Sequence, residues 1–303
     1  MVSIDEKRVY GAREGATAAY VVAEMGVVRV LISGDAVGEF SLLERCTARD
    51  LATGVGWLAV ATDEDVLVCD LSSESEEPAF ARTDFGPAVA VGIRDGTLLA
   101  ADANGRAGSL ALEALAASDW RDLTFADAKS PEEPTVRAAD GDLLATDAGV
   151  YRRSGTRLAH AGLSSVRDVS AAGVPLAATA DGLYRLGNGW MRDLEGAFDR
   201  VAADPLSDPG SLARAHALGD AVYEHGTDGA DPETASENGW RRLEAPNPDL
   251  VDVAYGEGVY AVTEDGTVLV ADPDRGPGTE SRWRPHAIGV RGVAAMVVPL
   301  ERA

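Results

Sequence analysis

Arginine and aspartate recur together at the start of apolar stretches along the whole chain. Arg49-Asp50 and Arg167-Asp168 are complete pairs, and Asp252 and Arg291 stand at matching places in later stretches. Clustered arginines can bind a carboxylate or phosphate through paired N–H donors, and a nearby carboxylic acid can transfer a proton. If the stretches converge, these residues predict a site for an anionic or sugar-like ligand. The alternative is that the opposite charges pair with one another and hold the structure together.

A repeated hairpin predicts that the stretches do converge. Segments 59–67, 145–151, 177–184 and 261–268 each consist of an apolar strand, a tight acidic or glycine turn and a second apolar strand. A short strand with a polar start precedes the hairpin, and a fourth strand, often with a tryptophan near its start, follows it. Four short strands in meander order are typical of a propeller blade, and first strands line the channel of a propeller.

First strands are expected near residues 50, 89, 136, 168, 200, 252 and 292. The last of these has no later strands to pair with, and residues 19–46 supply three strands that lack a first one. We therefore predict an all-β, seven-bladed β-propeller that forms a single domain over residues 1–303, closed by N- and C-terminal strands that share one blade. Six blades are the alternative because the unit at 200–250 is irregular, and a β-sandwich with similar hairpins is the competing architecture.

The charge of the chain excludes some partners. Asp and Glu number 50 against 27 Lys and Arg, so the net charge is −23, and Lys7 and Lys129 are the only lysines. Such a surface repels nucleic acid and anionic membranes. The acidic excess is spread over the whole chain, which favours adaptation to molar salt, where the Debye length is only ~3 Å. We expect a halophilic, archaeal protein.

Targeting and cofactor signals are not found in the sequence. Residues 1–20 have no apolar core beside positive charge, and segment 21–32 is too short and too charged to span a bilayer, so we expect a cytoplasmic protein. The four histidines share no metal-binding spacing, and no phosphate-binding glycine loop precedes a helix. We expect a monomer with no metal and no cofactor.

One unit carries a family resemblance. Asp181-Gly182-Leu183-Tyr184 followed by Asn188-Gly189-Trp190 resembles the neuraminidase-like (Asp-box) repeat propellers, and Asn238-Gly239-Trp240 repeats the ending. The upstream Ser and Asp of the strict Asp-box are missing, and the units at 47–80 and 85–112 lack the tryptophan. With its acidic, lysine-poor composition, nearly the whole chain is similar to uncharacterised haloarchaeal propeller proteins related to that superfamily. The resemblance implies the fold and carries no established activity.

Two functions follow from these observations. The first is a non-catalytic binding or scaffolding propeller that holds an unknown protein or small ligand by its loops or channel mouth. The second is a hydrolase or lyase at the channel mouth, with Arg167 and Asp168 at its centre. No catalytic residue can be assigned. A ring of closed Arg–Asp pairs would favour the first function, and an ion or ligand held by several channel carboxylates would favour the second.

Overall fold

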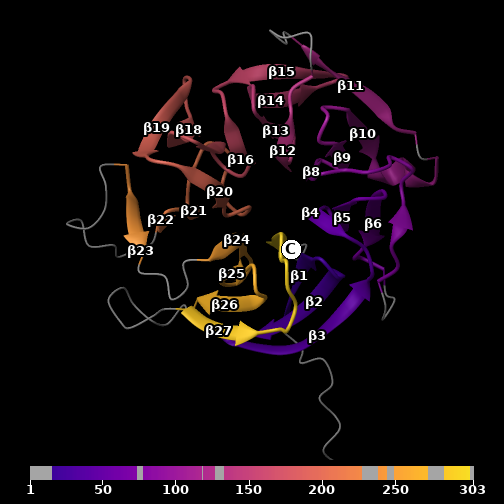
Figure 1. The fold of residues 1–303 in the computed structure, drawn as a ribbon, viewed down its shortest axis with the longest axis vertical. Helices are drawn as coiled ribbons and strands as arrows, with labels where there is room; N and C mark the ends of the chain where they lie inside the picture. The colour runs from indigo at the N-terminus through magenta and orange to yellow at the C-terminus, as the bar shows by residue number, and fades with distance from the viewer. Residues whose placement is uncertain are drawn as a thin grey trace, which may run out of the picture.

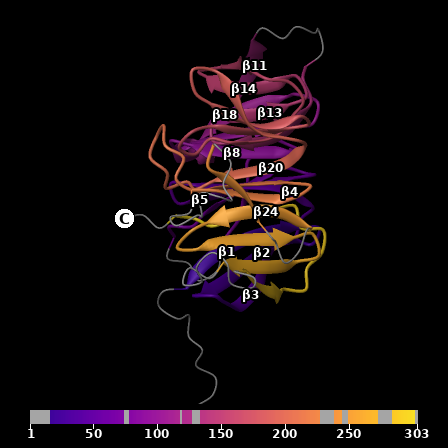
Figure 2. The ribbon, with the colours of Figure 1, turned by 90° about the vertical axis from the view of Figure 1, so that its left-hand side faces the viewer.

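The computed structural model describes residues 16–73, 78–117, 119–126, 133–226, 238–243, 249–271 and 283–300. Viewed along the short axis of the molecule, the sheets are arranged around a common centre (Figure 1). The side view shows a flattened body in which the strands of successive sheets lie over one another (Figure 2). The all-β propeller prediction is therefore confirmed.

Five four-stranded sheets stand as separate blades among the described residues. One joins the two ends of the chain in the order β28 (Ala295–Val297), β1 (Thr17–Ala23), β2 (Gly26–Ser33) and β3 (Ala36–Glu44). The second holds β4 (Ala48–Gly54), β5 (Trp57–Thr62), β6 (Val66–Asp70) and β7 (Ala81–Arg82). The third holds β16 (Val166–Ser170), β17 (Leu176–Thr179), β18 (Gly182–Leu186) and β19 (Trp190–Glu195). The fourth holds β20 (Phe198–Ala203), β21 (Ala215–Gly219), β22 (Val222–His225) and β23 (Trp240–Leu243). The fifth holds β24 (Leu250–Tyr255), β25 (Val259–Thr263), β26 (Thr267–Ala271) and β27 (Trp283–Ala287).

The remaining strands form one eight-stranded sheet rather than two separate blades. One half contains β8 (Ala90–Arg94), β9 (Thr97–Ala101), β10 (Ala107–Ala111) and β11 (Arg121–Ala126), with the 3-10 helix η2 (Leu112–Ala117) after β10. The other half contains β12 (Val136–Asp140), β13 (Leu143–Thr146), β14 (Gly149–Ser154) and β15 (Arg157–Gly162). The predicted count of seven blades, with six as the alternative, is therefore wrong, because only five blades stand alone in the described chain.

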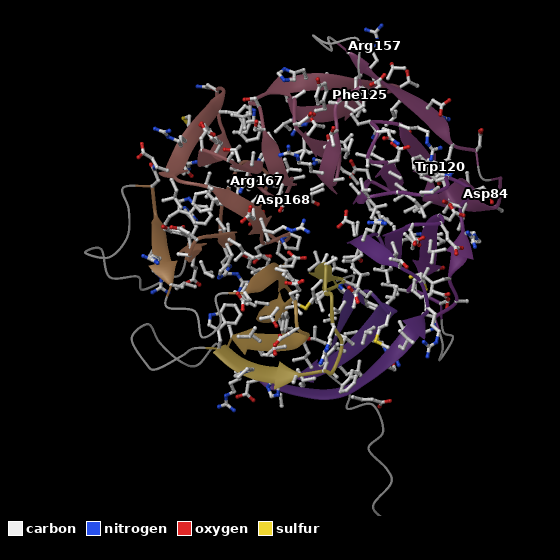
Figure 3. The ribbon with its side chains drawn as sticks, viewed as in Figure 1. Asp84, Trp120, Phe125, Arg157, Arg167 and Asp168 are labelled. Atoms are coloured by element: carbon white, nitrogen blue, oxygen red, sulfur yellow. The ribbon has the colours of Figure 1, made fainter. Side chains whose placement is uncertain are left out.

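The two halves are joined by β11, which divides its pairing between two neighbours. Its first three residues pair antiparallel with β10, and Thr124, Phe125 and Ala126 pair parallel with β15. The Phe125 ring, labelled in Figure 3, packs against the Tyr151 ring in a T-shaped arrangement, with 4.7 Å between the ring centroids. An outer strand of a sheet presents unpaired backbone groups, and this pairing satisfies part of two such edges at once.

The predicted shared blade is confirmed. β28 pairs antiparallel with β1 through Val22↔Ala295, Val21↔Met296 and Tyr20↔Val297. The Ala294 amide also donates to the Val22 carbonyl oxygen over 2.9 Å. Strands from opposite ends of the described chain therefore complete one sheet and close the ring (Figure 1).

A buried threonine explains the repeated hairpin. Thr62, Thr146, Thr179 and Thr263 each end the second strand of a sheet and are at most 1 % exposed. In each turn the threonine Oγ1 accepts a backbone N–H from the turn and donates to a carbonyl oxygen beyond it, as Thr146 does with Gly149 over 3.0 and 2.8 Å. The hydroxyl thus pairs backbone groups that would otherwise be buried without partners.

Aliphatic side chains pack between neighbouring sheets around the ring. One cluster, for example, sets Val28, Val30 and Ile32 of β2 against Val262 and Val268 of the adjacent blade. The tryptophans of the fourth strands add a bond between neighbours: the Nε1 of Trp190 donates to the Ala161 carbonyl oxygen of β15 over 2.8 Å. These contacts join neighbouring sheets around the ring.

Candidate channel-mouth site

The inner strands β4, β8, β12, β16, β20, β24 and β28 lie at sheet edges and line the central channel. Five of them, β4, β12, β16, β20 and β24, contain a register shift next to their first residue. A β-bulge of this kind inserts an extra residue and re-aims the side chains that follow it. Arg49 and Arg167 occupy the inserted position, and Asp50 and Asp168 follow it. The bulge therefore separates each predicted Arg–Asp pair, sending its two members to different places.

The aspartates that follow the bulge connect neighbouring inner strands. The carboxylates of Asp50, Asp168 and Asp252 accept the backbone N–H groups of Val91, Val201 and Met296 at 3.0, 2.8 and 2.8 Å. In each case the donor belongs to the next inner strand around the ring. Those N–H groups face the channel from a sheet edge and have no partner strand, so each carboxylate satisfies a group that the sheet leaves unpaired.

A second layer of the same contacts lies two residues further along the strands. The Asp140 carboxylate of β12 accepts the Ala171 N–H at 2.7 Å, and the Ser170 Oγ of β16 accepts the Ala203 N–H at 3.1 Å. Sequence reasoning missed both acceptors. The available signal was the two-residue periodicity of a strand, which places Ser170 on the same face as Asp168.

Arg200 is the other residue that the sequence did not single out. In β20 the order of the pair is reversed, so Arg200 takes the place that Asp168 has in β16. Its Nη1 lies 3.7 Å from Asp168 Oδ1, and its Nη2 donates to the Ala294 carbonyl oxygen at 3.2 Å. The sequence contains this reversal as Asp199-Arg200, and it places one cation in a channel layer where other inner strands have aspartate.

The reversed order also gives Arg167 its partner. Arg167 Nη1 donates to Asp199 Oδ1 at 2.5 Å, one layer above the Arg200–Asp168 contact. Two opposite ion pairs thus connect β16 and β20, and Figure 3 shows Arg167 and Asp168 near the centre of the ring. Arg49 lies at the inserted position of β4 and is exposed. Arg291 is exposed in the segment before β28 and lines neither channel cavity among the described residues.

The structure therefore brings together only part of the predicted set. Asp50, Asp168 and Asp252 meet inside the channel, where Arg200 and Asp140 join them. Arg49, Arg167 and Arg291 do not line that cavity. The bulge explains this division for Arg49 and Arg167, because it moves them out of the layer that holds the aspartates.

Burial governs the protonation of the channel carboxylates. Removal from water raises the pKa of Asp50 to about 7 and that of Asp252 to about 6, and it also raises the pKa values of Asp168 and Asp140. The backbone N–H bonds act in the opposite direction, as does the Arg200 charge at Asp50, Asp168 and Asp252. The four carboxylates also repel one another, so the ring holds negative charge less readily than free aspartates do.

Two hollows lie along the channel. The channel cavity measures about 330 Å³, is lined by all four carboxylates, and reaches the turns that follow the inner strands. The mouth hollow, at the opposite end, measures about 470 Å³ and is lined by the starts of β20 and β24, the Glu264 turn and segment 292–294. Arg200 lines both. Arg200 is therefore shared by the two hollows.

Among the described residues no group of three or more His, Cys, Asp or Glu has the geometry to hold a metal ion. Within the same ranges, no helix is long and apolar enough to cross a membrane. The channel ring instead offers carboxylates already bonded to backbone N–H groups and one partly satisfied guanidinium.

Comparisons with known proteins agree with this architecture. The family model described as HVO_0234-like beta propeller matches residues 3–299. No curated protein matches the sequence. A functionally unknown protein from Desulfotomaculum acetoxidans is similar in structure, with a TM-score of 0.62 and 9 % identity over 94 % of this chain and 100 % of the other.

Two further solved structures share the fold. The WD40 beta-propeller domain of Doa1 gives a TM-score of 0.58 and 13 % identity over 92 % of this chain and 90 % of that domain. Apo AztD from Citrobacter koseri gives a TM-score of 0.51 and 10 % identity over 85 % of this chain and 79 % of the AztD chain. At such low identity the likeness extends to the fold alone.

Proposed function

The chain belongs to the HVO_0234-like beta-propeller family, and from the geometry of its channel we propose that it is a non-catalytic binding or scaffolding propeller. A propeller fold supports a binding or scaffold-type role. The observation that carries the proposal is that Asp50, Asp168 and Asp252 each accept a backbone N–H from the next inner strand, and that Asp140 accepts one from Ala171, directly after β16. Carboxylates used in this way hold the ring together.

The same contacts argue against a hydrolase or lyase centred on Arg167 and Asp168. Arg167 is paired with Asp199, and Asp168 is bonded to Val201 and lies near Arg200. A general acid and an anion-binding arginine must both face one substrate. Here the two side chains belong to different layers and contact different partners.

The setting of this role is also part of the proposal. The net charge of −23 with only two lysines supports a halophilic, archaeal origin and a cytoplasmic location in molar salt. The acidic surface favours a protein or small-ligand partner over nucleic acid or a membrane. We expect the propeller itself to be a monomer.

Affinity capture in molar KCl tests the binding role. The tagged chain is recovered from cells that naturally produce it, and each co-purifying protein is then tagged and used for the reverse capture. A partner recovered in both directions at a fixed ratio supports the proposal. In parallel, the purified chain is incubated with anionic glycosides and with polysaccharides that contain uronic acids. Turnover that Asp168→Asn abolishes while the fold is retained would refute the non-catalytic assignment.

A further inference from the structure

The mouth hollow combines features of a small-ligand pocket. Its volume of about 470 Å³ lies within the range of about 300–1,000 Å³ that is usual for such pockets. Leu218, Leu250 and Val293 supply apolar wall from three different sheets or their connections. Among the described residues that line it, Arg200 is the only cation, and Asp199 and Glu264 are also present.

These three charged groups are not equivalent. Asp199 is neutralised by Arg167 at 2.5 Å. Glu264 is exposed, and its side chain forms no ion pair or hydrogen bond with the described part of the chain; only its backbone oxygen is bonded, to the Val293 N–H. The hollow therefore offers one carboxylate that is available to a ligand.

Arg200 is available in a different way. A guanidinium has five N–H donors, whereas Arg200 makes one bond to the Ala294 carbonyl oxygen and one 3.7 Å approach to Asp168. The charges of Asp50, Asp199 and Asp252 also act on it, but without a hydrogen bond. Its side chain is 31 % exposed, and it lines the hollow from the inner side. Unused donors therefore remain for a second acceptor.

We propose that the mouth hollow binds a small zwitterion with an apolar body, such as an aliphatic α-amino acid. The ligand carboxylate would bond to Arg200, its ammonium group would pair with Glu264, and its side chain would contact Leu218, Leu250 and Val293. This inference rests on the proposed binding role and assigns it a ligand class.

Electrostatics select the zwitterion over singly charged ligands. A simple anion would meet Arg200 but would be repelled by Glu264 and by the net charge of −23. A simple cation would pair with Glu264 but would meet the Arg200 guanidinium. A molecule that carries both charges satisfies each group, and contacts at hydrogen-bond distance persist in molar salt because screening acts over ~3 Å.

Three probes test the class of ligand on the full chain in molar KCl. L-Leucine carries both charges, 4-methylpentanoate lacks the ammonium group, and 3-methylbutylamine lacks the carboxylate. Titration calorimetry should give saturable binding of L-leucine in the millimolar range or tighter. Binding of each analogue should be about tenfold weaker or less, because one charged contact is lost. No saturable leucine binding, or equal binding of all three probes, would overturn the proposal.

Variants locate the site. Glu264→Gln should weaken leucine binding about tenfold, because the ammonium contact is lost. It should leave 4-methylpentanoate binding equal or stronger, because the same change removes a charge that repels the anion. Val251→Trp should fill the hollow and abolish binding of every probe. Glu257→Gln, an exposed change in the turn at the other end of the same blade, is the matched control and should bind as the unmodified chain does. Leucine binding unaffected by both Glu264→Gln and Val251→Trp would overturn the placement.

These results are independent of the capture experiment. A protein partner recovered in both directions without leucine binding would remove the ligand assignment and keep the scaffold. Thermal unfolding of each variant without ligand verifies that the variant is folded. A loss of binding can then be attributed to the substitution and not to unfolding.

Discussion

Removal of the Asp168 carboxylate should destabilise the ring. Asp168 is 7 % exposed, accepts the Val201 N–H at 2.8 Å and lies 3.7 Å from the Arg200 guanidinium. Asp168→Ala leaves a channel-facing N–H without an acceptor and reduces the charge that balances Arg200. A hydrogen bond to a charged group contributes roughly 1.5–3 kcal/mol, and solvation through the open channel recovers part of that. We expect the free energy of unfolding to fall by about 1–3 kcal/mol.

Two further variants separate the hydrogen bond from the charge. Asp168→Asn keeps an oxygen for Val201, and burial already disfavours the ionised carboxylate, so its loss should be about 1 kcal/mol or less. Asp199→Ala removes the exposed Arg167 pair of the layer above and should change stability by about 0–1 kcal/mol.

Urea unfolding in molar KCl, followed by circular dichroism, measures these differences. Urea carries no charge and leaves the ionic strength constant, and an unchanged slope allows the midpoints to be compared. If Asp168→Ala is as stable as the unmodified chain or more stable, the reasoning that the channel carboxylates hold the inner strands together is refuted. That result would favour a ligand role, because functional carboxylates crowd together at a cost in stability.

Three other outcomes follow from the same structure. Deletion of residues 291–303 removes β28, exposes the β1 edge and leaves Asp252 without the Met296 N–H. We expect aggregation in size-exclusion chromatography or a lower melting temperature in thermal unfolding. A soluble product with an unchanged melting temperature would contradict ring closure. Melting temperature should rise steadily from low to molar KCl because screening removes self-repulsion at net charge −23, and a flat or falling series would be inconsistent with this. Burial raises the pKa of Asp50 to about 7 and that of Asp252 to about 6, so the folded chain binds more protons than the unfolded chain. The stability that this proton binding contributes is fully present below about pH 4 and is lost as the pH rises through 6–7. Urea unfolding at pH 5 and pH 8 should therefore show a smaller pH dependence for Asp50→Asn than for the unmodified chain, and identical dependence in both would disprove this assignment.

The architecture was predictable where a local pattern determined it. The threonine hairpins and the tryptophan strands repeat along the chain, and the lone strand near residue 292 required a partner at the other end. The number of separate blades was not predictable in the same way. The number of blades depends on Thr124, Phe125 and Ala126 pairing with β15 instead of continuing the pairing with β10. Edge pairing between outer strands produces no periodic signal in the sequence of either strand.

The candidate site was predicted in part for a related reason. Asp50, Asp168 and Asp252 could be aligned because their strands share a register, which places them in one layer of the channel. The bulge then moved Arg49 and Arg167 away from them, although adjacent residues read as a pair in sequence. Arg200 was not predictable from the repeated order of Arg before Asp, because β20 has the reverse order and places the arginine where β16 has Asp168. Ligand binding by Asp50, Asp168 and Asp252 stays a prediction.

The closing strand also bears on how the chain folds during synthesis. β1, β2 and β3 are the first of the described strands to leave the ribosome, yet the strand that covers the β1 edge is the last of them to be made. Every other separate blade is continuous in sequence and can complete its own sheet as it emerges. The nascent chain therefore carries one open edge throughout translation, and in a crowded cell that edge is the point at which chaperones or neighbouring copies could engage it.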